Sequence, residues 1–307
     1  MKTHLSLICM ATRKSPLALA QAEIVKQKLL AAFAGITIEI VPMNTTGDEN
    51  VNMSLTEIGG KGLFTKELEE GLLSGRIDIA VHSLKDMETT LRPGLIIAAM
   101  LEREDPRDVL IAPQAHTLGG LERGARIGTS SLRRAAQMKI LRPDLIIEPM
   151  RGNVATRLAK LESNKCDATL LALAGLKRLG LEHKATEVFD SHYFIPAVGQ
   201  GILAIECRQE HHLLRDMLQA VNHYPTYAAG IAERSMLAVL DGSCRTPIAG
   251  YARFEQGNLT LDALVARKDG TRYVRTMRTG LAEGAVALGE ETAHELLANG
   301  GRECLTV

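Results

Sequence analysis

Segments that read as strands alternate with segments that read as helices along the first part of the chain. Leu5–Met10 is largely apolar, and the step Ser15-Pro16 after it combines a helix N-cap with a proline at the first helical position. Isoleucines then alternate with polar residues over Ile36–Ile40, which is the period of a strand. A helix over Phe64–Leu73 and a strand over Ile77–Val81 continue the series. This alternation indicates a mostly parallel sheet covered by helices.

The same pattern begins again near Asp108 and predicts a second α/β lobe of similar size. Its expected strands and helices, in chain order, are Asp108–Ala112, Arg126–Gly128, a helix from the cap Thr129-Ser130-Ser131 to about Leu141, Leu145–Ile147, Asn153–Ser163 and Ala168–Leu173. Ile202–Ile205 is a further apolar strand after a long connection with proline and glycine. The pattern alone leaves open which lobe this last strand joins.

From about Thr226 the pattern changes, and a small α+β third domain is expected. One helix extends to Leu240, and a final helix is predicted over Ala282–Ala298. Between them, the step Asp269-Gly270 is a hairpin signal. The alternating segments expected as strands are Ile248–Phe254, Leu259–Val265 and Tyr273–Met277.

Charge and composition exclude several classes of function. Lysine plus arginine and aspartate plus glutamate number 36 each, and aromatic residues make up only 3% of the chain. A nucleic-acid-binding protein normally has a basic excess and aromatic stacking platforms, so no nucleic-acid partner is expected. No apolar stretch approaches the roughly 20 residues of a membrane span.

Five cysteines are widely spaced, without a C-x-x-C motif, and the nine histidines form no H-x-x-x-H pattern. We therefore expect a reduced, cytoplasmic protein with no disulfide framework and no metal site. Near-neutral charge is compatible with a monomer.

Cys244 occupies a short loop between Gly242 and Pro247, with Arg245 next to it. Exposure and nearby positive charge are what a reactive thiolate needs. A lone cysteine is also commonly an inert packing residue, so both interpretations are open from the loop alone.

Arginines gather at the ends of predicted strands and in the first turns of the helices after them. In an α/β lobe the carboxyl ends of the strands face the ligand crevice, and the guanidinium group suits carboxylates or phosphates. An arginine in a first turn also opposes the helix dipole, which suggests a functional reason for it. The alternative is a set of solvated surface arginines. The residues are Arg13, Arg133, Arg134, Arg151, Arg157 and Arg178.

Lys85 and Asp86 follow the strand that ends near Val81. An aspartate at such a strand end is suited to move protons or to stabilise a cation. A helix cap or a surface Lys–Asp pair is the alternative. Gly59-Gly60-Lys61-Gly62 is not a P-loop, because no Ser or Thr follows the lysine, and it is interpreted as a loop that carries one cation.

Eight stretches in the same order give the chain a resemblance, over essentially its whole length, to the porphobilinogen deaminase (hydroxymethylbilane synthase) family. They are Ala11–Leu19, Thr46–Asp48, Gly60–Phe64, Val81–Asp86, Arg103–Asp108, Ile127–Arg134, Arg151–Arg157 and Pro196–Gly201. Several motifs in the right order are specific where a single one would not be. The cysteine loop departs from the usual family pattern at Ser243, Arg245 and Thr246.

The resemblance implies an α/β fold with two lobes like type II periplasmic binding proteins and a small α+β domain with a three-stranded antiparallel sheet. The implied boundaries are 1–101 with 202–220 for the first lobe, 107–196 for the second and 224–307 for the third domain. It also implies a dipyrromethane cofactor held by a thioether on Cys244. The implied reaction joins four porphobilinogen molecules to this primer, releases ammonia at each addition, and frees linear hydroxymethylbilane by hydrolysis.

The resemblance also assigns roles to residues. Asp86 matches the catalytic aspartate, which is expected to contact pyrrole N–H groups and to stabilise positive charge as ammonia leaves. The expected cofactor-binding residues are Cys244, Lys85, Ser131, Arg133, Arg134 and Asp86. The expected substrate-binding residues are Arg13, Ser15, Arg151, Arg157, Arg178, Lys61 and Phe64.

Two other classes of function fit the sequence less well. A non-enzymatic anion-binding protein with two lobes would not need Cys244, Asp86 or a third domain. A thiol-nucleophile enzyme would want a histidine base near the cysteine, and His211, His212 and His223 are distant in sequence.

Overall fold

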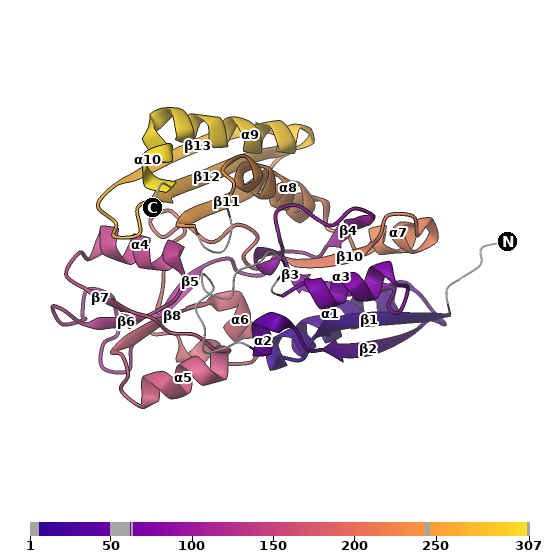
Figure 1. Ribbon diagram of the computed structural model, residues 1–307, viewed down its shortest axis with the longest axis horizontal. Coiled ribbons are helices and arrows are strands. Elements are labelled where there is room, and N and C mark those ends of the chain that lie inside the picture. The colour runs from indigo at the N-terminus through magenta and orange to yellow at the C-terminus, as the bar shows by residue number, and fades with distance from the viewer. Residues whose placement is uncertain (1–5, 50–61, 63, 243–245, 306–307) are drawn as a thin grey trace. The chain divides into compact units, whose positions relative to one another are not determined.

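The computed structural model describes residues 6–49, 62, 64–242 and 246–305 (Figure 1). The chain divides into two compact units. Met1–Arg103 and Ile202–Tyr227 form the first, and Glu104–Gly201 and Ala228–Val307 form the second. Each unit therefore contains two separate parts of the sequence.

The first unit is built on a five-stranded mixed sheet with the order β2-β1-β3-β10-β4. β1 is parallel to β2 and β3, whereas β10 is antiparallel to β3 and β4. The late strand β10 is thus inserted between two early ones. The elements are β1 (Leu7–Arg13), α1 (Pro16–Ala32), β2 (Thr37–Met43), α2 (Thr46–Glu49), α3 (Lys66–Leu73), β3 (Ile79–Ser83), the 3₁₀ turn η1 (Leu84–Asp86), β4 (Leu95–Met100), β10 (Leu203–Arg208) and α7 (His212–Gln219).

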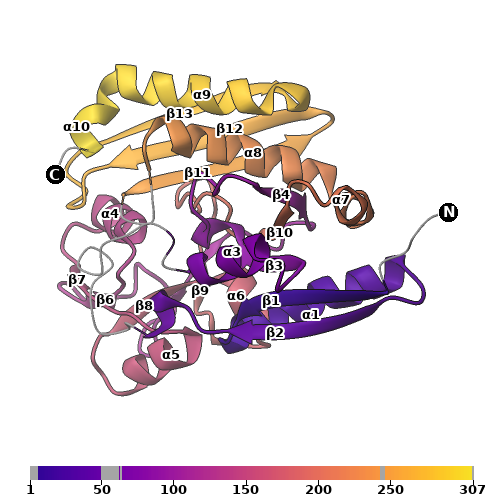
Figure 2. The same ribbon diagram turned by 45° about the vertical axis from the view of Figure 1, so that its right-hand side comes forward.

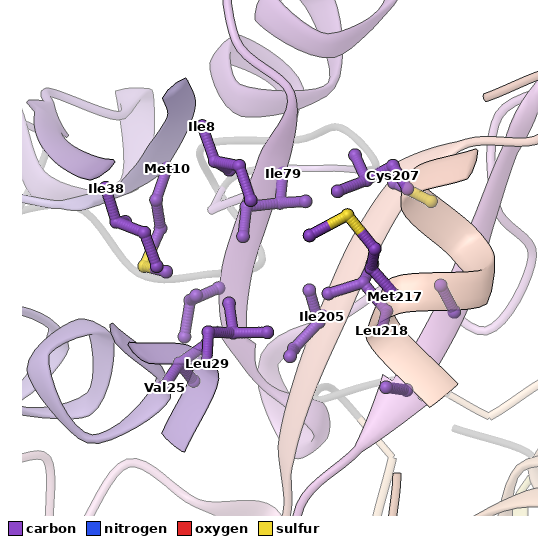
Figure 3. Close-up of a cluster of buried hydrophobic side chains, with 14 of the residues drawn as sticks. Ile8, Met10, Val25, Leu29, Ile38, Ile79, Ile205, Cys207, Met217 and Leu218 are labelled. Atoms are coloured by element: carbon purple, nitrogen blue, oxygen red, sulfur yellow. The ribbon is translucent and has the colours of Figure 1, made fainter. Parts of the chain in front are cut away.

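Helices cover both faces of this sheet, because successive strand residues point to opposite sides. Ile79 and Val81 of β3 pack with α1 and α7, whereas Ala80 between them packs with α3. Figure 3 shows the α1 and α7 side of this core, where Val25 and Leu29 of α1 lie near strand side chains and Met217 and Leu218 come from α7.

α1 begins as predicted. Ser15 is its N-cap, its hydroxyl accepts the N–H of Ala18 at 3.2 Å, and Pro16 is the first helical residue. The cap satisfies a backbone donor that would otherwise have no partner in the first turn. This fixes the path of the chain from β1 into α1.

The second unit contains a sheet with the comparable order β7-β6-β8-β5-β9. β6 is parallel to β7 and β8, and β5 is antiparallel to β8. Its elements are β5 (Asp108–Ile111), β6 (Arg126–Gly128), α4 (Leu132–Leu141), β7 (Ile146–Glu148), α5 (Val154–Glu162), β8 (Ala168–Ala172), α6 (Leu173–Arg178), the 3₁₀ turn η2 (Glu182–Lys184) and β9 (Glu187–Val188).

A three-stranded antiparallel sheet, β11-β12-β13, forms the remainder of the second unit with helices packed on it. Figure 2 shows α9 lying along this sheet. Gln256 and Gly257 both have positive φ and join β11 to β12 in a two-residue turn that matches the twist of a hairpin. The elements are α8 (Tyr224–Val239), β11 (Ile248–Glu255), β12 (Asn258–Ala266), β13 (Tyr273–Leu281), the 3₁₀ turn η3 (Ala282–Gly284), α9 (Ala285–Leu296), the π-helical turn η4 (Leu297–Gly301) and α10 (Arg302–Leu305).

The predicted α/β fold class is confirmed: two five-stranded mixed sheets of comparable strand order, each packed with helices, accompany a three-stranded antiparallel sheet. Several elements were not predicted from sequence, among them β4, α6 and α7. The strand expected to extend to Leu173 ends at Ala172, where α6 begins. Within the described part of the chain, no helix is long and apolar enough to cross a membrane.

Candidate active site

A small polar pocket lies in the first unit at the edge of the sheet where β1 and β3 end. These strands are parallel neighbours, so the residues after each of them meet at the same edge. The pocket has a volume of about 40 Å³. It is lined by Arg13, Ser15, Leu17, Ala18, Gln21, Phe64, Thr65, Val81, His82, Ser83 and Asp86.

The charged pair of this pocket consists of Arg13, at the end of β1, and Asp86, at the end of η1. Arg13 Nη1 lies 3.9 Å from Asp86 Oδ2. The guanidinium group of Arg13 also lies over the ring of Phe64, 4.3 Å from its centroid. An aromatic face attracts a cation at this distance. Phe64 therefore helps to hold the cation that faces Asp86, and the carboxylate keeps 37% of its side-chain surface exposed for a ligand.

Two side chains behind the pair fix the wall of the pocket. Gln21 Nε2 donates to Ser83 Oγ at 2.8 Å, and Ser83 Oγ donates back to Gln21 Oε1 at 3.2 Å. Gln21 is buried and extends from α1, so these bonds tie α1 to the end of β3. Ser15 lies at the same wall, where its hydroxyl caps α1.

The other predicted residues of the first unit are only partly described. Lys85 is half-buried in η1, next to Asp86. Lys61 lies outside the described residues. The first unit thus brings together Arg13, Ser15, Phe64 and Asp86 around one pocket.

In the second unit, two consecutive arginines of α4 converge on one carboxylate. Arg133 Nη1 lies 2.7 Å from Asp108 Oδ2, and Arg134 Nη2 lies 2.7 Å from Asp108 Oδ1. All three residues are buried. Arg133 also donates to the carbonyl of Ile195 at 2.8 Å, and Arg134 to that of Leu170 at 2.9 Å. These bonds explain how two cations are tolerated in the first turn of a helix.

The charges of this cluster do not cancel, because two guanidinium groups face one carboxylate. Burial disfavours the charged form of Asp108, but the two guanidinium charges outweigh it and hold the pKa of that carboxyl well below its usual range. Burial lowers the pKa of Arg133, and the Nε of Arg133 has no hydrogen-bond partner. The excess positive charge of this cluster favours an anionic group such as a carboxylate nearby. Ser131 caps α4 by accepting the N–H of Arg134 at 3.4 Å.

The remaining predicted arginines follow β7 and β8, strands parallel to β6, and so belong to the same edge of the second sheet. Arg151 comes after β7, and its carbonyl accepts a bond from Lys160 at 2.9 Å. Arg157 Nε donates to the carbonyl of Gly152 at 2.9 Å. Arg178 closes α6 and donates to the carbonyl of Gly201 at 2.7 Å, and burial lowers its pKa to about 10.

Cys244 lies outside the described residues, which resume at Thr246. The cysteines that are described, Cys9, Cys166, Cys207 and Cys304, are all free thiols. Burial raises the pKa of each of them, that of Cys207 to about 11. All four are therefore poor sources of thiolate at neutral pH.

Gly242, two residues before Cys244, is closely surrounded. A Cβ at this position would lie 2.4 Å from Leu237 Cδ1 and 2.6 Å from Ile248 Cδ1. A side chain here would therefore require Leu237 and Ile248 to move.

Among the described residues, no group of three or more histidine, cysteine or acidic side chains is placed to hold a metal ion.

Sequence reasoning did not single out four residues that the structure places at these sites. No sequence pattern marked Asp108 as a functional residue, because an aspartate at the start of a strand is common. Gln21, Thr65 and His82 contact or line the pocket from positions that read as ordinary helix or strand residues. The stretches Val81–Asp86 and Arg103–Asp108 included two of the four without assigning them a role.

Two family models match the chain. A family description, "Porphobilinogen deaminase, dipyromethane cofactor binding domain", matches residues 8–216. A second, "Porphobilinogen deaminase, C-terminal domain", matches residues 227–298. Together the two cover nearly the whole chain.

Among solved structures, the chain is similar to a putative methionine-binding lipoprotein from Bacillus subtilis, with 15% identity and a TM-score of 0.44 over 69% of this chain and 90% of that one. It is also similar to YhfZ from Shigella flexneri, with 20% identity and a TM-score of 0.40 over 78% and 93% of the two chains. A periplasmic substrate-binding protein of an ABC transporter from Coxiella burnetii has 15% identity and a TM-score of 0.44 over 70% and 91%.

Proposed function

The chain belongs to the porphobilinogen deaminase family, and from this we propose that Asp86 is its catalytic carboxylate and Cys244 its cofactor attachment site. The family activity is hydroxymethylbilane synthesis. The enzyme joins four porphobilinogen molecules head-to-tail onto a covalent dipyrromethane primer, releases ammonia, and then hydrolyses off linear hydroxymethylbilane for tetrapyrrole biosynthesis.

The observation that carries the assignment of Asp86 is its position in the pocket of the first unit. Its carboxylate is 3.9 Å from Arg13 and partly exposed, at an edge where two parallel strands end. A carboxylate there is placed to accept pyrrole N–H groups and to stabilise the positive charge that develops as the carbon–nitrogen bond of porphobilinogen breaks. The Arg13 guanidinium beside it is placed to bind an acetate or propionate side chain of the same pyrrole.

The dipyrromethane, when bound, supplies the primer onto which pyrroles are added. Its acidic side chains fit the excess positive charge that Arg133 and Arg134 place around Asp108. The resemblance to the family assigns the attachment to Cys244. The described cysteines support this, because burial raises the thiol pKa of each and makes it a weak nucleophile. The proposed cofactor-binding residues are Cys244, Lys85, Ser131, Arg133, Arg134 and Asp86.

The growing chain accumulates carboxylates, and arginines suit them because their planar fork pairs with a carboxylate through two bonds. Arg13 and Phe64 of the first unit, and the arginines at the strand ends of the second, support this role by their positions. The proposed substrate-binding residues are Arg13, Ser15, Lys61, Phe64, Arg151, Arg157 and Arg178.

The three sheets support a division into three domains. The proposed boundaries are 1–101 with 202–220, 107–196 and 224–307, each range containing one sheet. We also propose that the protein acts as a monomer in the cytoplasm. Free thiols at all the described cysteines support a reducing compartment.

One experiment tests the function directly. Purified protein is incubated with porphobilinogen, and ammonia and the linear tetrapyrrole are measured in parallel. Release of about one ammonia for each pyrrole incorporated is expected. Binding of porphobilinogen without ammonia release would contradict the proposal.

A further inference from the structure

A histidine and a glutamate form a buried pair next to the pocket of the first unit. His82 Nε2 lies 3.0 Å from Glu206 Oε2, and the side chains are 4% and 0% exposed. His82 belongs to β3 and Glu206 to β10. In their register Ala204 is opposite His82 and Glu206 is opposite Ala80, so the two side chains share one face of the sheet.

A third titratable group covers the same face from α3. Glu69 is buried, and burial raises the pKa of its carboxyl, with the negative charge of Glu206 adding to the effect. Arg92, which precedes β4, places its Nε 3.9 Å from Glu69. The cluster therefore contains two carboxyl groups and one imidazole, with a half-exposed arginine at its margin.

One polar atom of this cluster lacks a hydrogen-bond partner. Glu206 Oε1 is buried and accepts no hydrogen bond. An unpaired buried carboxylate oxygen costs free energy, and apolar side chains of similar volume usually serve stability as well as a buried ion pair does. Departures of this kind from local rules are typical of functional positions.

The cluster adjoins the pocket that contains Asp86. His82 and Thr65 both line this pocket with Arg13, Ser83 and Asp86. Thr65 begins the turn whose backbone leads to Glu69, because its carbonyl accepts the N–H of that residue at 2.9 Å. A polar pocket of about 40 Å³ has room for roughly two or three water molecules.

The condensation catalysed by the family releases one proton at each addition, and the role proposed for Asp86 puts this proton at the pocket. When two pyrroles are joined, the carbon–nitrogen bond of the protonated aminomethyl group breaks and its electron pair leaves with ammonia. A carbon–carbon bond forms from the π electrons of the accepting ring. The carbon–hydrogen bond of that ring then breaks, its electrons restore the aromatic ring, and one proton passes to a base.

We propose that His82, Glu206 and Glu69 take up, through water in the pocket, the proton that Asp86 receives at each condensation. Asp86 is thereby returned to its carboxylate form before the next porphobilinogen reacts, and the cluster then releases the proton to solvent through the same pocket water. The three residues are positioning residues, since they act through Asp86, and the inference rests on the role proposed for Asp86. The groups that face His82 are Glu206 from β10, Glu69 from α3, Arg92 beside Glu69, and Asp86 with Arg13 across the pocket.

The test compares the pH dependence of kcat in wild type, Glu206→Gln and His82→Gln. Glu206→Gln removes a negative charge beside the imidazole and favours its neutral form, so the acid limb of the profile is expected to move to lower pH. His82→Gln is expected to lower kcat about tenfold or more across the profile, with KM changed less than about twofold. Intact mass is measured first, to show that each variant carries the dipyrromethane.

Asp78→Asn is the matched control. Asp78 lies just before the opposite end of β3, where it accepts the N–H of Cys9 at 2.8 Å and lies 3.8 Å from Arg208. This variant also removes one carboxylate charge at β3 and is expected to lose stability, while the pH profile of kcat stays as in wild type. A purely structural role for the His82 pair predicts the same unchanged profile in Glu206→Gln, and that result would overturn the proposal.

A second readout does not depend on turnover. The His82 imidazole is followed by NMR in isotope-labelled protein, with His82→Gln for assignment and Glu69→Gln as a mild neutral variant. We expect the His82 signal to change across the pH range over which kcat changes, and this change to move to lower pH in Glu69→Gln. A His82 signal that stays constant across that range would reject the proposal even if Glu206→Gln failed to fold. If Asp86→Asn is inactive but the His82 signal does not change with pH, the role of Asp86 stands and only the role of the cluster is rejected.

Discussion

Arg13 Nη1 and Asp86 Oδ2 lie 3.9 Å apart at the ends of two segments that leave neighbouring parallel strands. Their separation follows from the topology, because β1 and β3 both terminate at this edge. Both side chains are partly exposed, so the pair contributes less than about 1 kcal/mol to stability. Its value lies in what it presents to a ligand: an anion and a cation side by side, with Phe64 behind the cation.

Replacement of Asp86 is expected to abolish turnover without disturbing the fold. Asp86→Asn keeps the shape of the side chain and removes the charge, so kcat should fall by about 10² to 10⁴. The thermal unfolding midpoint should stay close to that of wild type, because the carboxylate is partly exposed. Product formation is measured by mass spectrometry of the tetrapyrrole, and near-normal kcat in the variant would refute the catalytic role.

Intact mass is expected to identify the attachment cysteine. Active wild-type protein should exceed the 33.3 kDa chain by one dipyrromethane, and Cys244→Ser should lack this increment. Four matched controls exist in the same chain, Cys9→Ser, Cys166→Ser, Cys207→Ser and Cys304→Ser. Each should retain the added mass, because none of these thiols ionises readily. Loss of the increment in one of the four, with retention in Cys244→Ser, would relocate the attachment.

Asp108→Asn is expected to destabilise the second unit strongly. The substitution leaves two buried guanidinium groups without their shared counter-charge, which costs about 3–5 kcal/mol of unfolding free energy. The difference in unfolding free energy between wild type and Asp108→Asn is measured by urea unfolding. Arg126 and Asp167 form an exposed pair in the same unit, and Asp167→Asn should cost far less.

The same variant has a defined pH dependence. The pKa of Asp108 is held below its unfolded value of about 3.9, so its contribution to stability is complete above that pH and is lost as pH falls through the folded-state pKa. The difference in unfolding free energy between wild type and Asp108→Asn should therefore be constant from pH 7 to about pH 5 and shrink below about pH 4. A difference that already shrinks between pH 7 and 6 would contradict the ion-pair explanation.

Gly242→Ala is expected to disturb the approach to the cysteine loop. The added methyl group would contact Leu237 and Ile248 at 2.4 and 2.6 Å, and overpacking of this kind costs about 1–3 kcal/mol. We expect reduced stability and a reduced fraction of protein that carries the cofactor, read from intact mass. Gly284→Ala is the control, because a Cβ there meets nothing within 4 Å. Equal behaviour of the two variants would show that the packing at Gly242 does not matter to the loop.

Much of the fold followed from local patterns in the sequence. The Ser15-Pro16 step marked the start of α1, and alternation marked β2, β11 and β12. β4 was not predicted because Leu95–Met100 is almost fully buried and shows no alternation, so its period is invisible. α6 was missed for a related reason, since the apolar run of β8 continues into it without a break.

The candidate site was predictable where a residue occupies a strand end, and not where it depends on a distant partner. The position of Asp86 followed from that of the preceding strand. The burial of Arg133 and Arg134 did not, because only the tertiary structure brings Asp108 to them. The pair His82–Glu206 joins residues 124 positions apart, and no local pattern connects them.

The insertion of β10 between β3 and β4 has a consequence for the order in which the protein forms as it is synthesised. The first sheet lacks an interior strand until the ribosome has passed Arg208, whereas all five strands of the second sheet are complete by Val188. Until β10 has been synthesised, the edges of β3 and β4 that pair with it stay unpaired. Such open edges are where nascent chains aggregate, so this enzyme is expected to depend on chaperones during translation more than a lobe of contiguous sequence would.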